Sequence, residues 1–107
     1  MFEPSPDASV DMDRFWMDRA LQRARFAAEN DEVPIGALIV CDGAIVGAGW
    51  NATESEQDAT AHAELVALRQ AQRAFGSRRL EDTVLYTTLE PCAMCAGAIV
   101  LARIRRL

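Results

Sequence analysis

The chain has 107 residues, of which 50% are hydrophobic and 25% are charged. This length allows one domain, and the balance is typical of a globular protein rather than a disordered one. Eleven arginines and sixteen acidic residues give a net charge of −5, which argues against a non-specific nucleic-acid coat. Binding of one structured RNA through a local arginine patch is still compatible with this charge.

Acidic residues and prolines dominate the N-terminal segment. The first thirteen residues carry four acids and no base, the reverse of a secretory signal or a transit peptide. No apolar stretch of the chain approaches the ~20 residues that a membrane span requires. We therefore expect residues 1–12 to be a flexible acidic tail and residues 13–107 to form one domain. We expect the protein to be cytoplasmic, with no membrane partner.

Three helices are expected from the spacing of apolar residues and from helix-ending residues. They run over 13–29, 61–75 and 91–103, with Pro91 at the first position of the third helix. Most of the third helix is apolar or glycine, so we expect it to pack on the sheet with one side and on another subunit with the other. The expected buried stripe of the first helix consists of Met17, Ala20, Leu21, Ala24 and Ala28.

Three strands are expected between these helices. Residues 35–40 and 44–50 are joined by the strong hairpin turn Asp42-Gly43, and residues 83–88 are β-branched and aromatic. The element order α-β-β-α-β-α predicts a mixed sheet with helices packed on its faces.

Cys92 and Cys95 form a C-x-x-C pair at the start of the third helix. Sulfurs three residues apart share a helix face, and a helix N-terminus favours thiolates. Alone, this pair is compatible with metal binding, with redox chemistry or with two inert thiols. His62, the only histidine, and Glu64 lie at the start of the second helix. A lone histidine and a solvated acid are both ordinary features there.

Together, His62-x-Glu64 and Pro91-Cys92-x-x-Cys95 form the established signature of the zinc-dependent nucleobase deaminases. The 26 residues between Glu64 and Pro91 leave room for a helix and a strand, which lets the two helix starts meet at one edge of the sheet. One nitrogen and two sulfurs would hold zinc and leave its fourth position open, as in catalytic sites. We therefore expect His62, Cys92 and Cys95 to be zinc ligands.

Four longer segments carry a resemblance to a known family: residues 32–37, 49–51, 60–64 and 88–98. They resemble the bacterial tRNA-specific adenosine deaminases (TadA type) of the cytidine/deoxycytidylate deaminase superfamily, and the resemblance covers about residues 13–107. It implies a three-layer α/β/α sandwich around a mixed sheet, the cytidine deaminase-like fold. It implies a zinc-dependent hydrolase that converts adenosine to inosine at the tRNA wobble position. It also implies a homodimer that binds the tRNA anticodon stem-loop, with one Zn²⁺ per chain.

The resemblance further implies roles for single residues. Glu64 would take a proton from water, pass it to N1 of adenine and then protonate the leaving ammonia. Asn51 would hydrogen-bond the flipped base, and the backbone N–H of Ala63 would contact it. These roles are expectations that follow from the family and not from spacing.

The C-terminus departs from the family pattern. Relatives continue beyond Leu107 into further strands and helices, which supply part of the RNA-binding surface. We therefore expect a C-terminally truncated chain from which these strands and helices are missing. Two interpretations stay open for an arginine cluster, namely contact with RNA phosphates or an ordinary solvated helix face and loop. The cluster consists of Arg69, Arg73, Arg78 and Arg79.

Three other functions stay open. The first is a superfamily relative that deaminates a free base or nucleoside of the guanine or cytosine type. The second is a non-catalytic structural zinc module with Cys41 as the fourth ligand, although a plain core or turn thiol is the simpler interpretation of Cys41. The third is a thiol oxidoreductase built on Cys92 and Cys95, which would leave His62 and Glu64 without a role.

Overall fold

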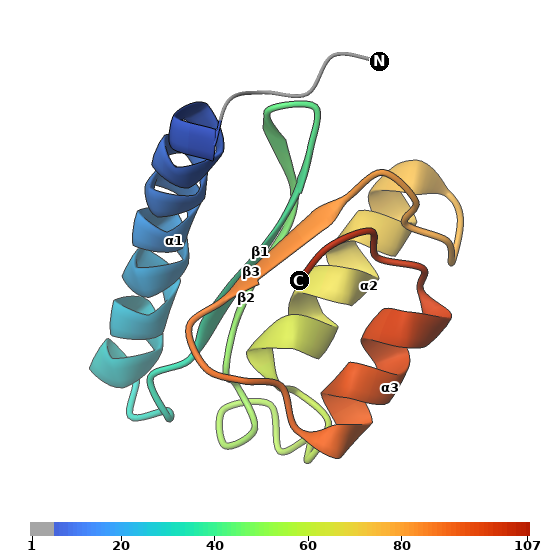
Figure 1. Cartoon of the computed structure of the whole chain (residues 1–107). Coiled ribbons are helices and arrows are strands. Elements are labelled where there is room, and N and C mark those ends of the chain that lie inside the picture. The colour runs from blue at the N-terminus through green and yellow to red at the C-terminus, as the bar shows by residue number, and fades with distance from the viewer. Residues whose placement is uncertain (1–5) are drawn as a thin grey trace.

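The computed structural model describes residues 6–107, with side chains from residue 11 onward. Its elements are α1 (Pro6–Glu29), β1 (Gly36–Cys41), β2 (Ala44–Trp50), α2 (Ala63–Phe75), β3 (Val84–Thr87) and α3 (Ala93–Leu101). Helix α1 covers one face of the sheet, and α2 and α3 cover the other (Figure 1). This arrangement confirms the expected three-layer α/β/α sandwich. Within the described residues, no helix is long and apolar enough to cross a membrane.

The three strands are ordered β2-β1-β3, and β1 is antiparallel to both neighbours. Asp42 and Gly43 form the turn between β1 and β2 with φ of 50° and 76°, the left-handed conformation that a type I′ hairpin requires. The parallel component of the expected mixed sheet is one bridge between Val84 and Arg106. There the N–H of Leu85 donates to the carbonyl of Arg106 at 2.9 Å. The sheet therefore becomes mixed only at the outer edge of β3.

Buried clusters flank the sheet on both sides, one under α2 and α3 and the other under α1. The predicted stripe of α1 is wrong for Leu21 and Ala28, which are exposed. The helix lies so close to β1 that a Cβ at Gly36 would stand 2.6 Å from the backbone nitrogen of Ala24. Small side chains are therefore needed where α1 passes over Gly36, and Ala20 and Ala24 provide them. The buried inner face of α1 consists of these two alanines together with Ala27 and Trp16.

Helix α1 begins at Pro6 rather than at Asp13. The predicted start of the first helix at Asp13 is therefore wrong, because residues 6–12 are already helical. Residues 1–5 of the expected tail lie outside the described part of the chain. Proline suits the first helical turn because the N–H that it lacks would have no partner within the helix. Proline is therefore a helix-start signal as well as a tail signal.

Candidate metal centre

Helices α2 and α3 each begin directly after a residue with a metal-binding side chain. His62 is the N-cap of α2 (φ −75°, ψ 149°), and Cys92 is the N-cap of α3 (φ −71°, ψ 173°). The helix starts predicted at residues 61 and 91 are therefore early, and Pro91 precedes the N-cap. Among the described residues, neither N-cap side chain caps its own helix, so both donors are left for another partner. Both helices begin at the same end of the molecule (Figure 1).

The donor atoms of His62, Cys92 and Cys95 lie within 4.8 Å of one another. The Nδ1 atom of His62 is 3.7 Å from Sγ of Cys92 and 3.5 Å from Sγ of Cys95. A tetrahedral zinc ion, with bonds of about 2.3 Å to sulfur and about 2.1 Å to nitrogen, would hold a sulfur and a nitrogen about 3.6 Å apart. The three residues therefore fit one Zn²⁺ per chain, as expected from the sequence. A fourth coordination position is left for a small ligand such as water.

The two thiols of the site have different environments. Cys95 is fully buried, and this burial, together with the nearby carboxylate of Glu64, raises the pKa of its thiol. Cys92 is exposed, and the neighbouring backbone N–H of Cys95 at the start of α3 lowers the pKa of its thiol. Zinc binds cysteines as thiolates. Cys92 therefore loses its proton more readily than Cys95, which needs a nearby cation to stabilise its thiolate.

Glu64 lies in the first turn of α2, and only 4% of its surface is exposed. The carboxylate of Glu64 acts to raise the pKa of both thiols, Cys95 and Cys92, because it lies close to them. The carboxylate therefore stands beside the metal donors without being one of them. Ala63, the preceding residue, is fully buried, and its backbone N–H belongs to the first helical turn, where N–H groups have no partner within the helix.

Asn51 follows directly after β2 and is 5% exposed. Its backbone N–H donates to the carbonyl of Ile35 at 3.1 Å. The next N–H, of Ala52, donates to the carbonyl of Ala61 at 2.9 Å, which brings Asn51 close to His62 at the start of α2. Within the described chain the side-chain amide of Asn51 makes no hydrogen bond, so both its oxygen and its NH₂ group are available to a ligand.

Cys41 lies at the other end of β1 from the metal donors. Strands rise about 3.3 Å per residue, so the six residues of β1 separate Cys41 from the site by well over 10 Å. The thiol of Cys41 contacts the carboxylate of Asp42, with Sγ 3.9 Å from Oδ2. Cys41 does not join the donor cluster in the described structure. This removes the fourth ligand on which the structural zinc module depends.

Two strand glycines, for which no structural role was expected from the sequence, hold α2 in place. A Cβ at Gly49 would lie 2.9 Å from the backbone nitrogen of Ala67, and a Cβ at Gly47 would lie 3.2 Å from the Cβ of Ala71. Helix α2 therefore packs directly on the backbone of β2. Glycines inside a predicted strand are a sequence signal for such close approach. Through this contact the backbone of β2 sets the position of His62 and Glu64.

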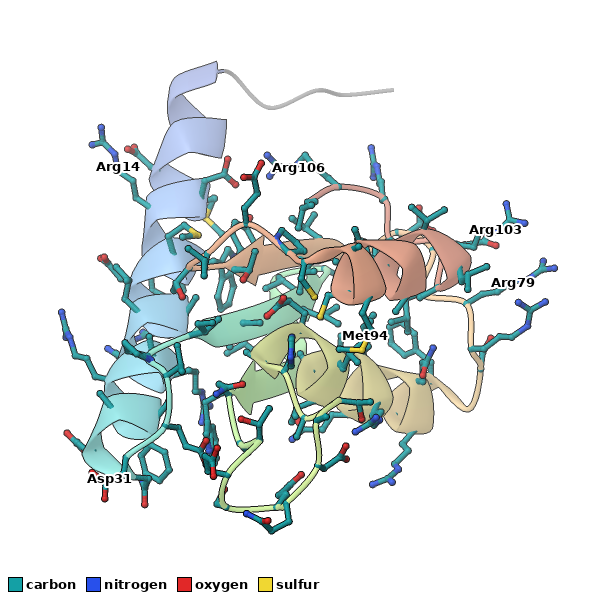
Figure 2. The ribbon with its side chains drawn as sticks, turned by 90° about the horizontal axis from the view of Figure 1, so that it is seen from below. Arg14, Asp31, Arg79, Met94, Arg103 and Arg106 are labelled. Carbon is teal, nitrogen blue, oxygen red and sulfur yellow. The ribbon has the colours of Figure 1, made fainter. Side chains whose placement is uncertain are left out.

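The arginine cluster stays outside the metal centre. All four of its side chains are exposed, and Nη2 of Arg69 donates a hydrogen bond to Oγ1 of Thr60 at 3.1 Å. Arg79 lies beyond the end of α2 and points away from the body of the molecule (Figure 2). Both interpretations of the cluster, RNA contact and solvated surface, are compatible with this exposure. Its role is still a prediction.

A groove of about 400 Å³ runs along the free edge of β3. Its lining includes Asp13 and Met17 of α1, Tyr86 of β3, and Arg106 and Leu107 near the C-terminus. None of the three metal donors lines this groove. The candidate site is therefore defined by the donor cluster and by Glu64, Asn51 and Ala63 around it.

Comparisons with known proteins agree on one family of deaminases. The family model of the cytidine and deoxycytidylate deaminase zinc-binding region matches residues 10–107. A tRNA-specific adenosine deaminase of Buchnera aphidicola subsp. Schizaphis graminum (strain Sg) is 54% identical over 95 residues. The aligned part is 89% of this chain and 63% of that protein, so the chain spans less than two thirds of this relative's length. The expected resemblance to tRNA-specific adenosine deaminases is confirmed.

Solved structures support the same fold. One comes from a study of A-to-I editing by tRNA:A34 deaminases at the wobble position of transfer RNA. It has a TM-score of 0.85 and 52% identity, and the match covers 88% of this chain and 72% of that chain. Guanine deaminase from Bacillus subtilis has a TM-score of 0.84 and 41% identity, and the match covers 87% of this chain and 60% of that chain. Proteins that act on two different purines thus share this architecture.

Proposed function

Because the chain belongs to the cytidine and deoxycytidylate deaminase family, we propose that it is a zinc-dependent hydrolase that converts adenosine to inosine at the wobble position of a tRNA anticodon. The observation that carries the proposal is the buried carboxylate of Glu64 beside a His–Cys–Cys donor set that fits zinc. The similarity to tRNA-specific adenosine deaminases favours adenosine in tRNA as the substrate. We propose that residues 13–107 contribute the zinc-binding part of this deaminase.

The chemistry requires a water activated near neutral pH and a group that moves protons. Zinc held by His62, Cys92 and Cys95 would supply a bound water whose pKa is lowered towards ~7. In the proposed reaction the water oxygen forms a bond to C6 of adenine, the C6–N bond breaks, and ammonia leaves. Glu64 would accept one proton of the water and deliver it to N1, and would then accept the second proton from the oxygen bonded to C6 and deliver it to the leaving nitrogen. Its place in the first turn of α2, one residue beyond the buried Ala63, supports this role.

Base recognition is assigned to two groups next to the metal donors. The free side-chain amide of Asn51 would donate to and accept from the edge of the flipped base. The backbone N–H of Ala63 would donate to the same base, which its place in the first turn of α2 allows. Both groups belong to residues with 5% exposure or less, so the hydrogen bonds would form away from bulk water.

We also propose a homodimer as the working form, in the cytoplasm, with the tRNA anticodon stem-loop as the partner. One side of α3 packs on the core through Cys95, Ile99 and Ala102. On its other side Val100 is 73% exposed and Leu101 is 71% exposed. An apolar helix face of this kind is typical of a subunit interface. Sedimentation equilibrium measures the association directly, and a monomer at all concentrations would refute the dimer.

The decisive experiment measures inosine formation in an anticodon stem-loop with a wobble adenosine, using zinc-loaded protein. Glu64→Gln keeps the size of the side chain and removes the proton shuttle, so the rate should fall by at least about 100-fold. Glu29→Gln, on the exposed end of α1, is the control for loss of one negative charge and should keep the parent rate. A folded, zinc-bound parent that makes no inosine would contradict the proposal.

Guanine deamination is the second candidate, because the fold matches guanine deaminase from Bacillus subtilis almost as well as the tRNA:A34 deaminase structure. The same zinc-loaded protein should therefore be offered free guanine, cytosine, adenosine and the stem-loop in parallel. We expect a product only from the stem-loop. A clear preference for guanine would replace the tRNA substrate with a free base.

A further inference from the structure

The loop between β2 and α2, residues 51–61, connects two parts of the candidate site. It starts with Asn51, and it leads into His62. Its two ends are joined by the hydrogen bond from the N–H of Ala52 to the carbonyl of Ala61. Inside the loop the N–H of Asp58 donates to the carbonyl of Thr53 at 3.1 Å. We call residues 51–61 the Asn51 loop.

The outer part of the Asn51 loop is held by a residue from another part of the chain. Glu32 lies between α1 and β1 and is 6% exposed. Its Oε2 accepts the backbone N–H of Ser55 at 2.7 Å, and its Oε1 accepts the N–H of Glu54 at 3.1 Å. These two N–H groups keep the pKa of Glu32 below its ordinary value, so the clamp is a carboxylate at neutral pH. Hydrogen bonds to an ionised acceptor are stronger than neutral ones.

The segment that carries Glu32 is itself tied to both halves of the site. The carbonyl of Ile35 accepts the N–H of Asn51. The N–H of Gly36 donates to Oγ1 of Thr88 at 3.1 Å, and its carbonyl accepts the N–H of Thr88, four residues before Cys92. Residues 32–36 therefore form one strap that fixes the Asn51 loop relative to the strand that leads to the metal donors. Glu32 is the side chain through which this strap reaches the outer part of the loop.

We propose that Glu32 is a positioning residue for base binding, acting through the two backbone N–H groups that its carboxylate holds in the Asn51 loop. The clamp keeps the loop in one shape, so the amide of Asn51 meets the base without first having to order the chain around it. Glu32 itself does not touch the base or the metal. The inference deepens the proposed deaminase function and rests on it for the identity of the ligand, whereas the clamp can be measured separately.

The test compares Glu32→Gln with the parent and with Glu56→Gln, all zinc-loaded. Glutamine has the same length, but its NH₂ group cannot accept an N–H, so at least one clamp bond is lost. Glu56 is exposed on the same loop and controls for the loss of one negative charge there. Amide hydrogen exchange at Glu54 and Ser55 reports the clamp, metal analysis reports the zinc site, and steady-state kinetics with the stem-loop report the reaction.

In Glu32→Gln the two amides should exchange at least about tenfold faster, and KM should rise about tenfold, as expected for the loss of one hydrogen bond to a charged group. The value of kcat should change by less than about threefold, and zinc should stay at one per chain. The control variant should match the parent in all four measurements. Glu32→Asp keeps the charge on a shorter arm and should recover part of both the amide protection and KM.

Several results would overturn the proposal. Unchanged amide exchange in Glu32→Gln would show that there is no clamp. Faster exchange with an unchanged KM, or with a loss of zinc, would make Glu32 a structural staple and not a positioning residue. If the parent makes no inosine, the deaminase proposal fails, and the dissociation constant of the stem-loop replaces KM in the comparison. A parent that neither reacts nor binds refutes both proposals, even where the amides are protected.

Discussion

Helices α2 and α3 begin in the same way and are supported very differently. Each has a metal donor at its N-cap, His62 in one and Cys92 in the other, with extended backbone at that residue. Helix α2 lies directly on the backbone of β2 at Gly47 and Gly49. Helix α3 reaches the core with one side only and leaves an apolar face exposed. The candidate metal centre therefore joins a firmly packed helix to a half-covered one.

The N-termini of α2 and α3 therefore contribute differently to the candidate site. The start of α2 supplies one donor together with Glu64 and Ala63, and its position follows from the packing of small residues on β2. The start of α3 supplies the two sulfurs. A bound zinc ion would link the two helices and so add support where α3 has little packing of its own. Variants that act on one helix at a time can separate these contributions.

The largest effect is expected from removing a sulfur that ties α3 to α2. Cys95→Ser should reduce bound zinc from one per chain to nearly none. It should also cost about 4 kcal/mol of unfolding free energy when free zinc is about 1,000 times the dissociation constant of the parent. Metal analysis and chemical denaturation measure both. Cys41→Ser is the matched control and should keep one zinc, and equal losses in the two variants would contradict the assignment of the donors.

A pair of glycine substitutions tests the packing difference directly. Gly49→Ala forces a Cβ to within 2.9 Å of the backbone of α2 and should destabilise the protein by about 3 kcal/mol. Gly97→Ala, in α3, has no heavy atom within 4 Å of the new Cβ. It should stabilise the protein by about 0.5–1 kcal/mol, because alanine favours helix. Denaturant titration of the two variants gives the comparison, and effects of the same sign would refute it.

The segment after α3 is anchored to α1 by an ion pair. Oδ1 of Asp13 lies 2.7 Å from Nη2 of Arg106, and it also accepts a hydrogen bond from the hydroxyl of Tyr86 at 2.7 Å. The hydrogen bond from Arg106 holds the pKa of Asp13 below its ordinary value. The folded state therefore binds this proton less readily than the unfolded state, and the pair stabilises the fold above the ordinary carboxyl pKa.

Asp13→Asn should therefore lower the unfolding free energy by about 1 kcal/mol at pH 7, a modest value because both side chains are partly exposed. The difference from the parent should shrink as the pH falls through the lowered pKa of Asp13. Unfolding titrations at several pH values between about 7 and 3 measure this trend. A difference that is independent of pH would show that the charge of Asp13 is not the cause.

The smallest effect on the fold is expected at the exposed face of α3. Leu101→Gln should change the unfolding free energy of the monomer by less than about 0.5 kcal/mol, because 71% of Leu101 is exposed. It should weaken self-association about tenfold if this face lies in the dimer. Sedimentation at several concentrations measures the association. An unchanged association constant would place the dimer elsewhere.

Sequence alone was sufficient for the features that depend on residue type at short range. The signature around His62 and Cys92 predicted the donor set, since metal chemistry restricts which side chains can serve. The Asp42-Gly43 turn predicted the β1–β2 hairpin, because few other residues tolerate its backbone conformation. The order of elements predicted a mixed sheet with helices on its faces, and the family resemblance implied the three-layer sandwich. The hairpin inference uses neighbours in the chain, whereas the donor set required two motifs, separated by 26 residues, to be recognised together as one signature.

Only the tertiary structure decided how these parts meet. The buried face of α1 follows from its close approach to Gly36, which overrides the apolar periodicity around Leu21. The sheet is antiparallel except where Arg106 returns beside Val84. Glu32 reaches Ser55 across 23 positions of the chain. Such contacts depend on which backbones come together after folding, and no local pattern of residues specifies that.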